Sequence, residues 1–458
     1  MQKRFSILDR PLLAKIALNW ELICWVTIIL VAIGTRFWDL GSRAQHHDES
    51  MHSFYSWELY RGRGLVHNPL LHGPFLYHAT AVIYFLVGAS DYTSRIAPAL
   101  FGVGIVIAPY FLRKWLGRYG ALAAAAMFAI SPGFLYYSRF IRMDIFAAGF
   151  EILMFIAVIK YLHERRELYL YVVAAALALL FSTKEISYIT TFLFGTFLVM
   201  LFAWEWLQDR KFPPDLASLD LVILIGSLCA PLYFSALIIK VLRLWDALDY
   251  TNYGRHDLLV LLLVTAVFAA LGLVWNRRRW LISAGIFWAI YLLLHTTLLT
   301  NMGGLLTGPI GALGYWLVQQ EVKRGGQPWF YYLILIPLYD FLPLLLASLG
   351  VGYLSFRQVG KFRRSPDKKA VWPVPDLFWI FLAYWGFVGF VIYSWAGEKM
   401  PWLAVHLTLP MILLAARFFG ETLERTDWSE FVRSRGHYLL LAVPVATLAA
   451  LGFLAASL

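Results

Sequence analysis

The stretch that decides the fold is residues 257–275, which read DLLVLLLVTAVFAALGLVW. After its first residue it carries no charge, and it is followed by Asn276 and by three arginines at 277–279. The hydrocarbon core of a membrane is roughly 30 Å thick and needs about 20 apolar residues per helix. This stretch therefore predicts a helix that crosses a membrane, and similar runs recur along the chain.

The composition of the 458 residues indicates the same class of protein. Hydrophobic residues make up 60% and charged residues 15%, and the mean hydropathy is +0.66. A soluble chain usually carries about 25% charged residues, so a water-soluble enzyme and a nucleic-acid-binding module are excluded, despite the net charge of +11. In a membrane protein that surplus indicates positive loops on the cytoplasmic side and contact with anionic lipid. Cys24 and Cys229 lie in apolar runs and are interpreted as buried hydrophobes.

About thirteen spans are predicted from such runs. They lie near 19–37, 93–112, 119–137, 144–162, 168–183, 186–206, 219–241, 257–275, 280–300, 329–355, 376–395, 402–419 and 438–457. The run 73–90 is either a short span or a helix that lies at the membrane interface. If it stays on the outer side, the basic loops share one face and hold about 25 of the 39 Lys and Arg, as the positive-inside rule requires. We therefore predict an interfacial helix there and a cytoplasmic N-terminus.

The predicted fold class is an all-α polytopic membrane protein with a single domain, residues 1–458. Residues 38–92 form the first extracytoplasmic loop, with one or two interfacial helices at about 49–62 and 73–88. No cleavable signal peptide is expected, because the basic start leads into an apolar stretch that is too long. No sizeable soluble domain is expected after the last span.

The densest polar segment is 46–52, HHDESMH, directly after the first span. Asp48 and Glu49 repel one another when ionised, and near apolar surroundings they need a cation or a proton. One interpretation is a general base with a partner that holds substrate or metal. The alternative is a solvated loop that happens to be polar.

A second polar segment is 136–144, which follows the third span. On a helix, Arg139 and Arg142 would share a face and grip a phosphate, and Asp144 would add a third carboxylate to the site. Alternatively, both arginines reach toward lipid headgroups with Asp144 as their counter-charge.

Three more outer segments carry polar residues. Lys184 and Glu185 either cap helix ends or line the same cavity. Glu398 and Lys399 fit a cavity wall, whereas Pro401 begins a helix and His406 lies about one turn further on. The glycines of the outer loop between 301 and 329 either let backbone approach a substrate or make turns.

These segments together resemble a known family. The carboxylate pair, residues 72–77 (HGPFLY) and residues 95–102 (RIAPALFG) look like the GT-C superfamily of membrane glycosyltransferases. That superfamily includes protein O-mannosyltransferases and the lipid A aminoarabinose transferase. The chain is more similar still to a mannosyltransferase-like family labelled flippase-activity-associated, found in archaea and bacteria. Its pattern is echoed by SRFIRMD at 138–144, TKE at 183–185, GGQPWFYY at 325–332 and GEKMPW at 397–402, so the resemblance covers nearly the whole chain.

The resemblance implies an enzyme of the plasma membrane that moves a mannose-like sugar from a polyprenyl-phosphate donor to an acceptor at the extracytoplasmic face. Asp48 would act as the base and the reaction would invert the sugar, while Asp144 would complete the site, in some relatives with a divalent metal. Glu49 would orient the acceptor or bind the metal with His46 or His47. The expected partners are the lipid-linked sugar, membrane lipid and glycan-assembly proteins of the cell envelope.

One position departs from the family pattern. Relatives often have a lysine before a proline pair to meet the donor phosphate, whereas this chain has His72 followed by Gly and Pro. A histidine is only partly charged at neutral pH. The phosphate contact would then shift to Arg139, Arg142, Lys184 or Lys399, unless the donor differs.

Two other functions stay open. A transporter or flippase component would move lipid-linked sugars without chemistry and should carry charged or broken segments in mid-span, often in repeated halves. The clearest charges lie instead at the outer ends of spans and no inverted repeat is evident, with Pro337, Asp340 and Pro343 as the exception. A non-catalytic scaffold would tolerate replacement of both Asp48 and Glu49.

Overall fold

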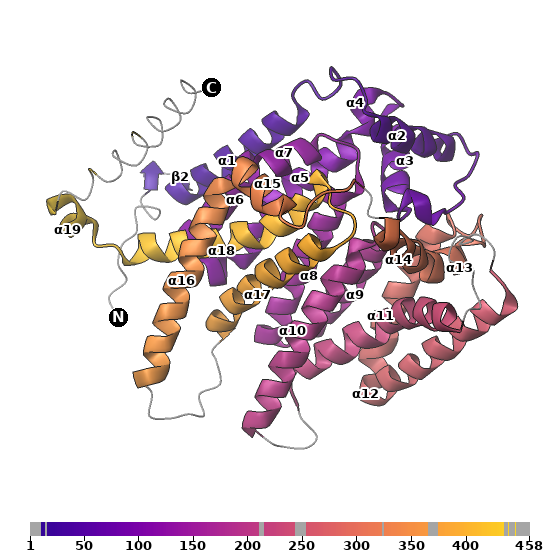
Figure 1. Ribbon diagram of the computed structural model, residues 1–458. Helices are drawn as coiled ribbons and strands as arrows, with labels where there is room; N and C mark the ends of the chain where they lie inside the picture. The colour runs from indigo at the N-terminus through magenta and orange to yellow at the C-terminus, as the bar shows by residue number, and fades with distance from the viewer. Residues whose placement is uncertain are drawn as a thin grey trace.

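The computed structural model describes residues 11–13, 16–209, 215–242, 253–322, 325–364 and 374–434, together with Tyr438 and Val445. Within these ranges the chain is almost entirely helical (Figure 1). The strands among them, β1 (Pro11–Leu13) and β2 (Ile16–Asn19), form one antiparallel pair ahead of the first helix. The all-α class predicted from the sequence is confirmed.

In chain order, one set of helices ends at residue 209 and the next helix begins at residue 217. The first set consists of α1 (Trp20–Phe37), α2 (His47–Tyr60), η2 (Pro69–Leu71), α3 (Phe75–Val87), α4 (Asp91–Ser94), α5 (Ile96–Ile107), η3 (Ala108–Leu112), α6 (Arg113–Ile130), α7 (Pro132–Ser138), α8 (Met143–Glu164), α9 (Glu167–Phe181) and α10 (Ile186–Asp209). The second set consists of α11 (Ala217–Val241), α12 (Arg255–His295), α13 (Gly304–Leu306), η4 (Thr307–Gly311), α14 (Ala312–Val322), α15 (Tyr331–Tyr339), α16 (Phe341–Arg364), α17 (Val374–Trp395), η5 (Pro401–Leu403), α18 (Ala404–Arg425) and α19 (Trp428–Arg433).

The predicted spans coincide with helices wherever the structure describes them, but some differ in form. The run 93–112 and most of 119–137 lie in one helical stretch, Asp91–Ile130, which is interrupted at Gly117, and the end of the second run lies in α7. The run 257–275 and most of 280–300 lie in α12, which is interrupted at Asn276. In the described part of the chain, eight helices are long and apolar enough to cross a membrane, or nine if α15 and α16 count as one. The run 438–457 lies almost wholly outside the described residues, so the total of about thirteen stays a prediction.

The span predicted at 329–355 is broken. Its two halves, α15 and α16, meet at Asp340 with a bend of 107°. Pro343 explains the break, because it has no N–H for the carbonyl of Tyr339 and its ring would clash with that carbonyl in a continuous helix. Asp340 is buried, and it accepts hydrogen bonds from the hydroxyls of Ser131 (2.6 Å) and Thr408 (3.3 Å). Asp340 was the mid-span residue that favoured a transporter. Its carboxyl group has hydrogen-bond partners at the bend between two helices.

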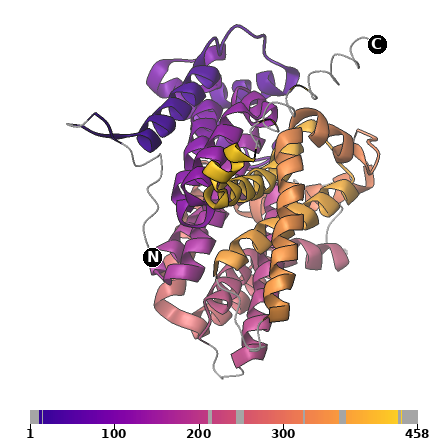
Figure 2. The same ribbon diagram turned by 90° about the vertical axis from the view of Figure 1, so that its left-hand side faces the viewer.

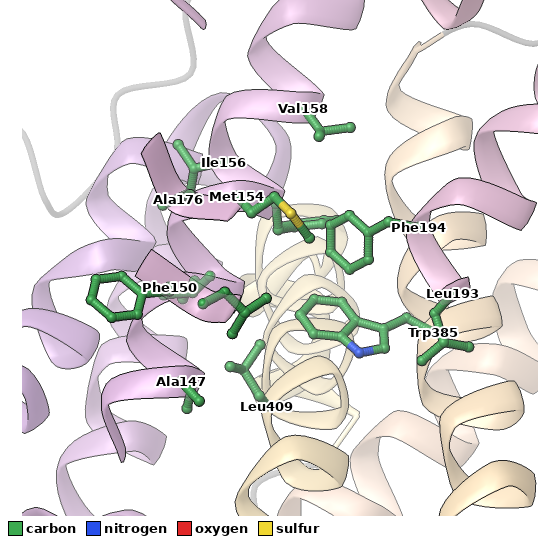
Figure 3. Packing of buried hydrophobic residues seen from close by; sticks show 14 of the residues in the cluster. Ala147, Phe150, Met154, Ile156, Val158, Ala176, Leu193, Phe194, Trp385 and Leu409 are labelled. Carbon is green, nitrogen blue, oxygen red and sulfur yellow. The ribbon is translucent and has the colours of Figure 1, made fainter. Parts of the chain in front are cut away.

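Helix α8 runs through the interior of the bundle. Figure 3 shows Met154 of α8 beside Phe194 of α10, with Trp385 of α17 and Leu409 of α18 close by, whereas the ring of Phe150 points to the opposite side of α8. The rings of Phe194 and Trp385 lie 5.0 Å apart between centroids. Each of these side chains is buried, and close packing between them supplies the van der Waals attraction that holds helices together in lipid. The middle of α8 is thereby packed against α10, α17 and α18.

Helix α18 is held close to α6 by small residues. A Cβ atom on Gly420 would lie only 2.6 Å from the backbone nitrogen of Gly120. Glycine at both positions lets the two backbones approach, which is the usual packing device where lipid removes the hydrophobic drive between helices. The packing sets the distance between the C-terminal part of α18 and α6.

The two ends of the bundle differ in chemistry. At one end, two ion pairs, Arg165–Asp215 (2.7 Å) and Arg279–Glu167 (2.9 Å), and a hydrogen bond between Lys114 and His163 join loops that the sequence predicts to be cytoplasmic. At the other end lie α2 and α3, which Figures 1 and 2 show far from the C-terminal end of α10, near residue 209. These helices have 14 and 13 residues, too short to cross a membrane. The structure therefore groups the loops as predicted, while the side that faces the cytoplasm stays a prediction.

Candidate active site

The end of the bundle that carries α2 gathers reactive side chains from separate parts of the chain. Asp48 lies in the first turn of α2, Arg142 and Asp144 at the start of α8, and Lys184 in the turn between α9 and α10. Trp402 precedes α18. Each of the other side chains contacts Arg142 or Asp144. Four of the predicted site residues, Asp48, Arg142, Asp144 and Lys184, therefore lie together, although the sequence separates them widely.

Arg142 joins the two aspartates. Its Nη1 donates to Asp48 Oδ2, and its Nε donates to Asp144 Oδ2 at 3.1 Å. Its guanidinium carbon lies 3.4 Å from the centroid of the Trp402 ring. The side chain of Asp144 is fully buried, whereas that of Asp48 is 26% exposed. Asp48 is therefore the carboxylate of this pair that a substrate can reach.

Asp144 also anchors a chain of polar contacts that runs into the bundle. Lys184 Nζ donates to Asp144 Oδ1 at 2.6 Å, and Nε2 of His406 lies 3.5 Å from the same oxygen. The other ring nitrogen of His406 lies 2.8 Å from Glu151 Oε2, and Thr190 donates to Glu151 Oε1 at 2.6 Å. Glu151 follows Asp144 by two helical turns and shares its face of α8. The network thus extends from the site into the membrane-spanning part.

Unlike the neighbouring Asp48, Glu49 is buried in an ion pair with arginine. Both of its oxygens accept from the fork of Arg95, at 2.8 and 2.9 Å, and Arg43 adds a contact at 2.9 Å. The backbone N–H groups of His46 and Ile141 donate to it as well. Glu49 and Arg95 are fully buried, and a bidentate pair of this kind fixes geometry as well as charge. Glu49 therefore ties the start of α2 to the start of α5 and orients Asp48.

A glycine brings the loop before α3 against the α9–α10 turn. A Cβ atom on Gly73 would lie 2.2 Å from the carbonyl of Ser182, so only glycine fits here. The Gly73 N–H donates to the Thr183 carbonyl at 3.1 Å. The approach places His72 Nδ1 at 2.6 Å from Glu185 Oε2. His72 has a φ of 63°, a strained backbone for a residue other than glycine.

A cleft opens beside these contacts. It is lined by His72, Lys184, Glu185, Ile186, Ile189, Trp316, Gln320, Tyr393, Ala396, Glu398, Trp402 and Leu403. Two indoles, carboxylates and an amide are the groups that stack on sugar rings and bind their hydroxyls. The free volume is only about 30 Å³, far below the roughly 300–1,000 Å³ of ordinary ligand sites. The cleft must therefore widen when a ligand enters.

The charges of the site change the proton affinities of its members. Partial burial favours a raised pKa for Asp48, but the charge and hydrogen bond of Arg142 outweigh it and hold that pKa below its ordinary value. Burial lowers the pKa of Lys184, although Asp144 opposes the shift. Burial also lowers the pKa of His52 to about 3, assisted by the nearby cations. Near neutral pH, Asp48 is therefore ionised and His52 is neutral.

The remaining predicted residues lie around this centre. Arg139 is not on a helix with Arg142, and its guanidinium caps α1 by donating to the carbonyls of Thr35 and Trp38, both at 2.7 Å. Lys399 is buried and donates to the carbonyl of Ala396 at 2.7 Å. Glu398 lines the cleft. Arg139 thus contacts the end of a helix rather than the cleft.

The residues predicted to hold a metal do not form a ligand set. The side chain of His46 caps α2 by accepting from the Asp48 amide at 3.2 Å, and His47 is exposed. The oxygens of Glu49 are taken up by arginines and amides. Over the described ranges of the chain, no group of three or more His, Cys, Asp or Glu side chains is arranged to hold a metal ion. The residues present therefore do not fit a divalent metal at this site.

Sequence reasoning missed several members of the site. Glu151 lies seven residues after Asp144, and this helical spacing was a usable signal. His52 and His406 were noted in their segments but were not predicted as site residues, since neither spacing nor charge pattern reveals a contact between separate helices. Arg95 gave no signal apart from its place in the family resemblance.

Comparison with known proteins places the fold. A family model described as dolichyl-phosphate-mannose-protein mannosyltransferase matches residues 71–229. No curated protein matches the chain significantly in sequence. Among solved structures, the oligosaccharyltransferase AglB of Archaeoglobus fulgidus, in complex with an inhibitory peptide and a dolichol-phosphate, is 17% identical with a TM-score of 0.57. That match covers 93% of this chain and 54% of AglB.

Two further structures are similar. ArnT of Cupriavidus metallidurans, bound to undecaprenyl phosphate, is 18% identical with a TM-score of 0.51, and the match covers 93% of this chain and 63% of ArnT. The Archaeoglobus fulgidus oligosaccharyltransferase in complex with Zn and sulfate is 17% identical with a TM-score of 0.54, over 92% of this chain and 51% of that one. The chain thus spans less than two thirds of the length of these proteins. It is a polytopic membrane protein that shares their fold, as the GT-C resemblance predicts.

Proposed function

We propose that the protein is a membrane glycosyltransferase that moves a sugar from a polyprenyl-phosphate donor to a hydroxyl acceptor at the extracytoplasmic face. The observation that carries the proposal is the cluster in which a reachable carboxylate, Asp48, contacts the buried cation Arg142, while Asp144 joins Arg142 to a second buried cation, Lys184. A base and preplaced positive charge are what displacement of a lipid phosphate needs. The shared fold and the partial family match support the same class of reaction.

Asp48 is the proposed base. The acceptor hydroxyl gives its proton to the carboxylate as its oxygen attacks the anomeric carbon, and the bond from that carbon to the phosphate oxygen breaks. The electron pair of the broken bond leaves with the lipid phosphate, and attack from the opposite face inverts the sugar. Glu49 acts indirectly, because its pairing with Arg95 fixes the start of α2.

Arg142 and Lys184 are the proposed phosphate partners. The leaving phosphate gains charge as the bond breaks, so cations that are already in place stabilise the transition state more than the ground state. Both cations are held by Asp144, which fixes their positions before substrate binds. Lys184 lines the cleft beside His72, which Glu185 orients. Histidine in place of the family lysine therefore still puts a basic group beside Lys184.

An apolar groove near the site suits the lipid part of the donor. The groove is lined mainly by hydrophobic side chains of α15, α16, α17 and α18. Its lining includes Tyr332, whose hydroxyl donates to the carbonyl of Met400 and accepts from the Met400 amide, both at 3.1 Å. Met400 is two residues from Trp402. The proximity supports a polyprenyl chain in the groove with its phosphate near Arg142.

The finer assignments follow the resemblance. Mannose as the donor sugar rests on the description of the family model. A plasma-membrane location with a cytoplasmic N-terminus rests on the distribution of Lys and Arg between the loops. A glycan-assembly protein of the cell envelope is the proposed partner for acceptor delivery.

One observation favours a second candidate, a flippase component that moves lipid-linked sugar without chemistry. Glu151 and His406 are buried inside α8 and α18, and ionisable residues inside membrane helices commonly mark transport pathways. The two functions differ in whether the sugar–phosphate bond is broken.

The test uses the purified full chain in lipid nanodiscs with polyprenyl-phosphate mannose and a hydroxyl acceptor. Released polyprenyl phosphate and glycosylated acceptor are measured together by mass spectrometry. A glycosyltransferase gives both products in equal amounts. Tight donor binding without either product would instead support the flippase component.

A further inference from the structure

The place between Asp48 and Asp144 is where a divalent metal would be expected. Two carboxylates that face the same ligand attract a cation, because their charges otherwise repel, and Mg²⁺ or Mn²⁺ prefers carboxylate oxygens. One protein of the same fold is described in complex with Zn. In this chain the cation between the two carboxylates is Arg142.

We propose that Arg142 and Lys184 together take the place of a divalent metal, so that this protein binds no such ion at the site and transfers sugar without one. The inference rests on the proposed function for its catalytic part, whereas its metal-binding part stands alone.

The oxygens of Asp144 are already occupied. Arg142 Nε lies 3.1 Å from Oδ2 and Lys184 Nζ lies 2.6 Å from Oδ1, while His406 lies 3.5 Å from Oδ1. The side chain of Asp144 is fully buried, so a metal ion would have to displace a cation that already pairs with it. Asp48 alone does not supply the number of ligands that these metals require.

Arg142 is also fixed in position. Its guanidinium lies against the Trp402 ring at 3.4 Å, and it is held by both carboxylates. Arg142 and Lys184 supply two positive charges, the same number as a divalent metal. A guanidinium binds phosphate oxygens through paired N–H donors, so the leaving phosphate still meets a cation.

Mn²⁺ binding tests the inference without any substrate. The full chain is stripped with EDTA in nanodiscs of zwitterionic phosphatidylcholine, and bound Mn²⁺ is measured by electron paramagnetic resonance. Wild type should bind no more Mn²⁺ than Asp48→Asn. Arg142→Gln should bind Mn²⁺ with an affinity at least about tenfold higher than that of wild type. Arg142→Gln combined with Asp48→Asn should return to the affinity of wild type. Arg142→Lys, which keeps the charge, should bind no Mn²⁺.

Mn²⁺ binding by wild type that disappears in Asp48→Asn would overturn the inference, whatever Arg142→Gln does. Transfer activity gives the second reading, since wild type should retain its rate in EDTA, and a rate restored only by Mn²⁺ would also overturn it. If wild type transfers no sugar under any condition, the proposed function fails while Mn²⁺ binding still decides the metal question.

Discussion

The guanidinium carbon of Arg142 lies 3.4 Å from the centre of the Trp402 ring, which joins the start of α8 to the start of α18. The same guanidinium contacts Asp48 and Asp144. A buried arginine that pairs with two carboxylates and one aromatic face has little freedom to move. Packing between helices therefore fixes the position of the positive charge of Arg142 in the proposed site.

Trp402→Leu should lower kcat/KM for sugar transfer by about 30-fold, because a desolvated cation–π contact contributes about 2 kcal/mol. The matched control is Trp329→Leu, since Trp329 is 67% exposed and its ring packs against Phe330. Steady-state kinetics of released polyprenyl phosphate measure both. Equal rates in the two variants would contradict a role for the Arg142–Trp402 contact.

Glu49→Gln should lower the stability of the folded protein. Removing one partner of a buried ion pair costs about 3–5 kcal/mol, and both Glu49 and Arg95 are fully buried. Glu58→Gln is the control, because Glu58 pairs with an exposed arginine, Arg63, and such pairs contribute about 0–1 kcal/mol. Thermal unfolding in detergent compares them. Similar melting temperatures would show that the Glu49 pair is not a structural tie.

The pH dependence of transfer should depend on Lys184. Its pKa is lowered by burial, and the ammonium form is the one that binds phosphate. Activity is therefore lost as pH rises through that lowered pKa, before an ordinary lysine would lose its charge. Lys184→Arg keeps its charge at all accessible pH values and should move the alkaline decline to higher pH. Profiles of kcat/KM between pH 6 and 10 that decline together would refute this assignment.

The stability of the fold should fall in acid because of His52. Its pKa is lowered from an ordinary 6.5 to about 3, so the unfolded chain binds a proton at a pH where the folded chain does not. Stability is complete above pH 6.5 and is lost as pH falls toward 3, by up to about 2 kcal/mol at pH 5. His52→Gln should flatten this dependence, whereas His47→Gln, at an exposed position, should leave it unchanged. Unfolding midpoints at pH 5 and 7 measure the difference.

Much of the fold follows from the sequence because membrane helices are long apolar runs. The breaks inside them follow less directly. Gly117 and Asn276 interrupt helices within the short basic segments that separate predicted spans, whereas the bend at Asp340 lies inside a predicted span, where the nearby prolines are the local signal for it.

The site was partly predictable for a related reason. Polar residues at the ends of apolar runs are conspicuous, so Asp48, Asp144 and Lys184 were identified individually. Their contacts with one another were not predicted, because these depend on how separate helices pack. The predicted pairing of Arg139 with Arg142 on one helix was wrong, because Arg139 lies in the turn before α8. His406 meets Asp144 only through the packing of α18 on α8.

The most direct test of the central claim is release of polyprenyl phosphate by Asp48→Asn, with Asp39→Asn as the control. Asp39 is an exposed aspartate of the same loop, and asparagine tolerates its positive φ. We predict that Asp48→Asn loses at least about 100-fold in rate, the contribution of a general base, while it melts like wild type and Asp39→Asn keeps the wild-type rate. A wild-type rate in Asp48→Asn would contradict Asp48 as the base.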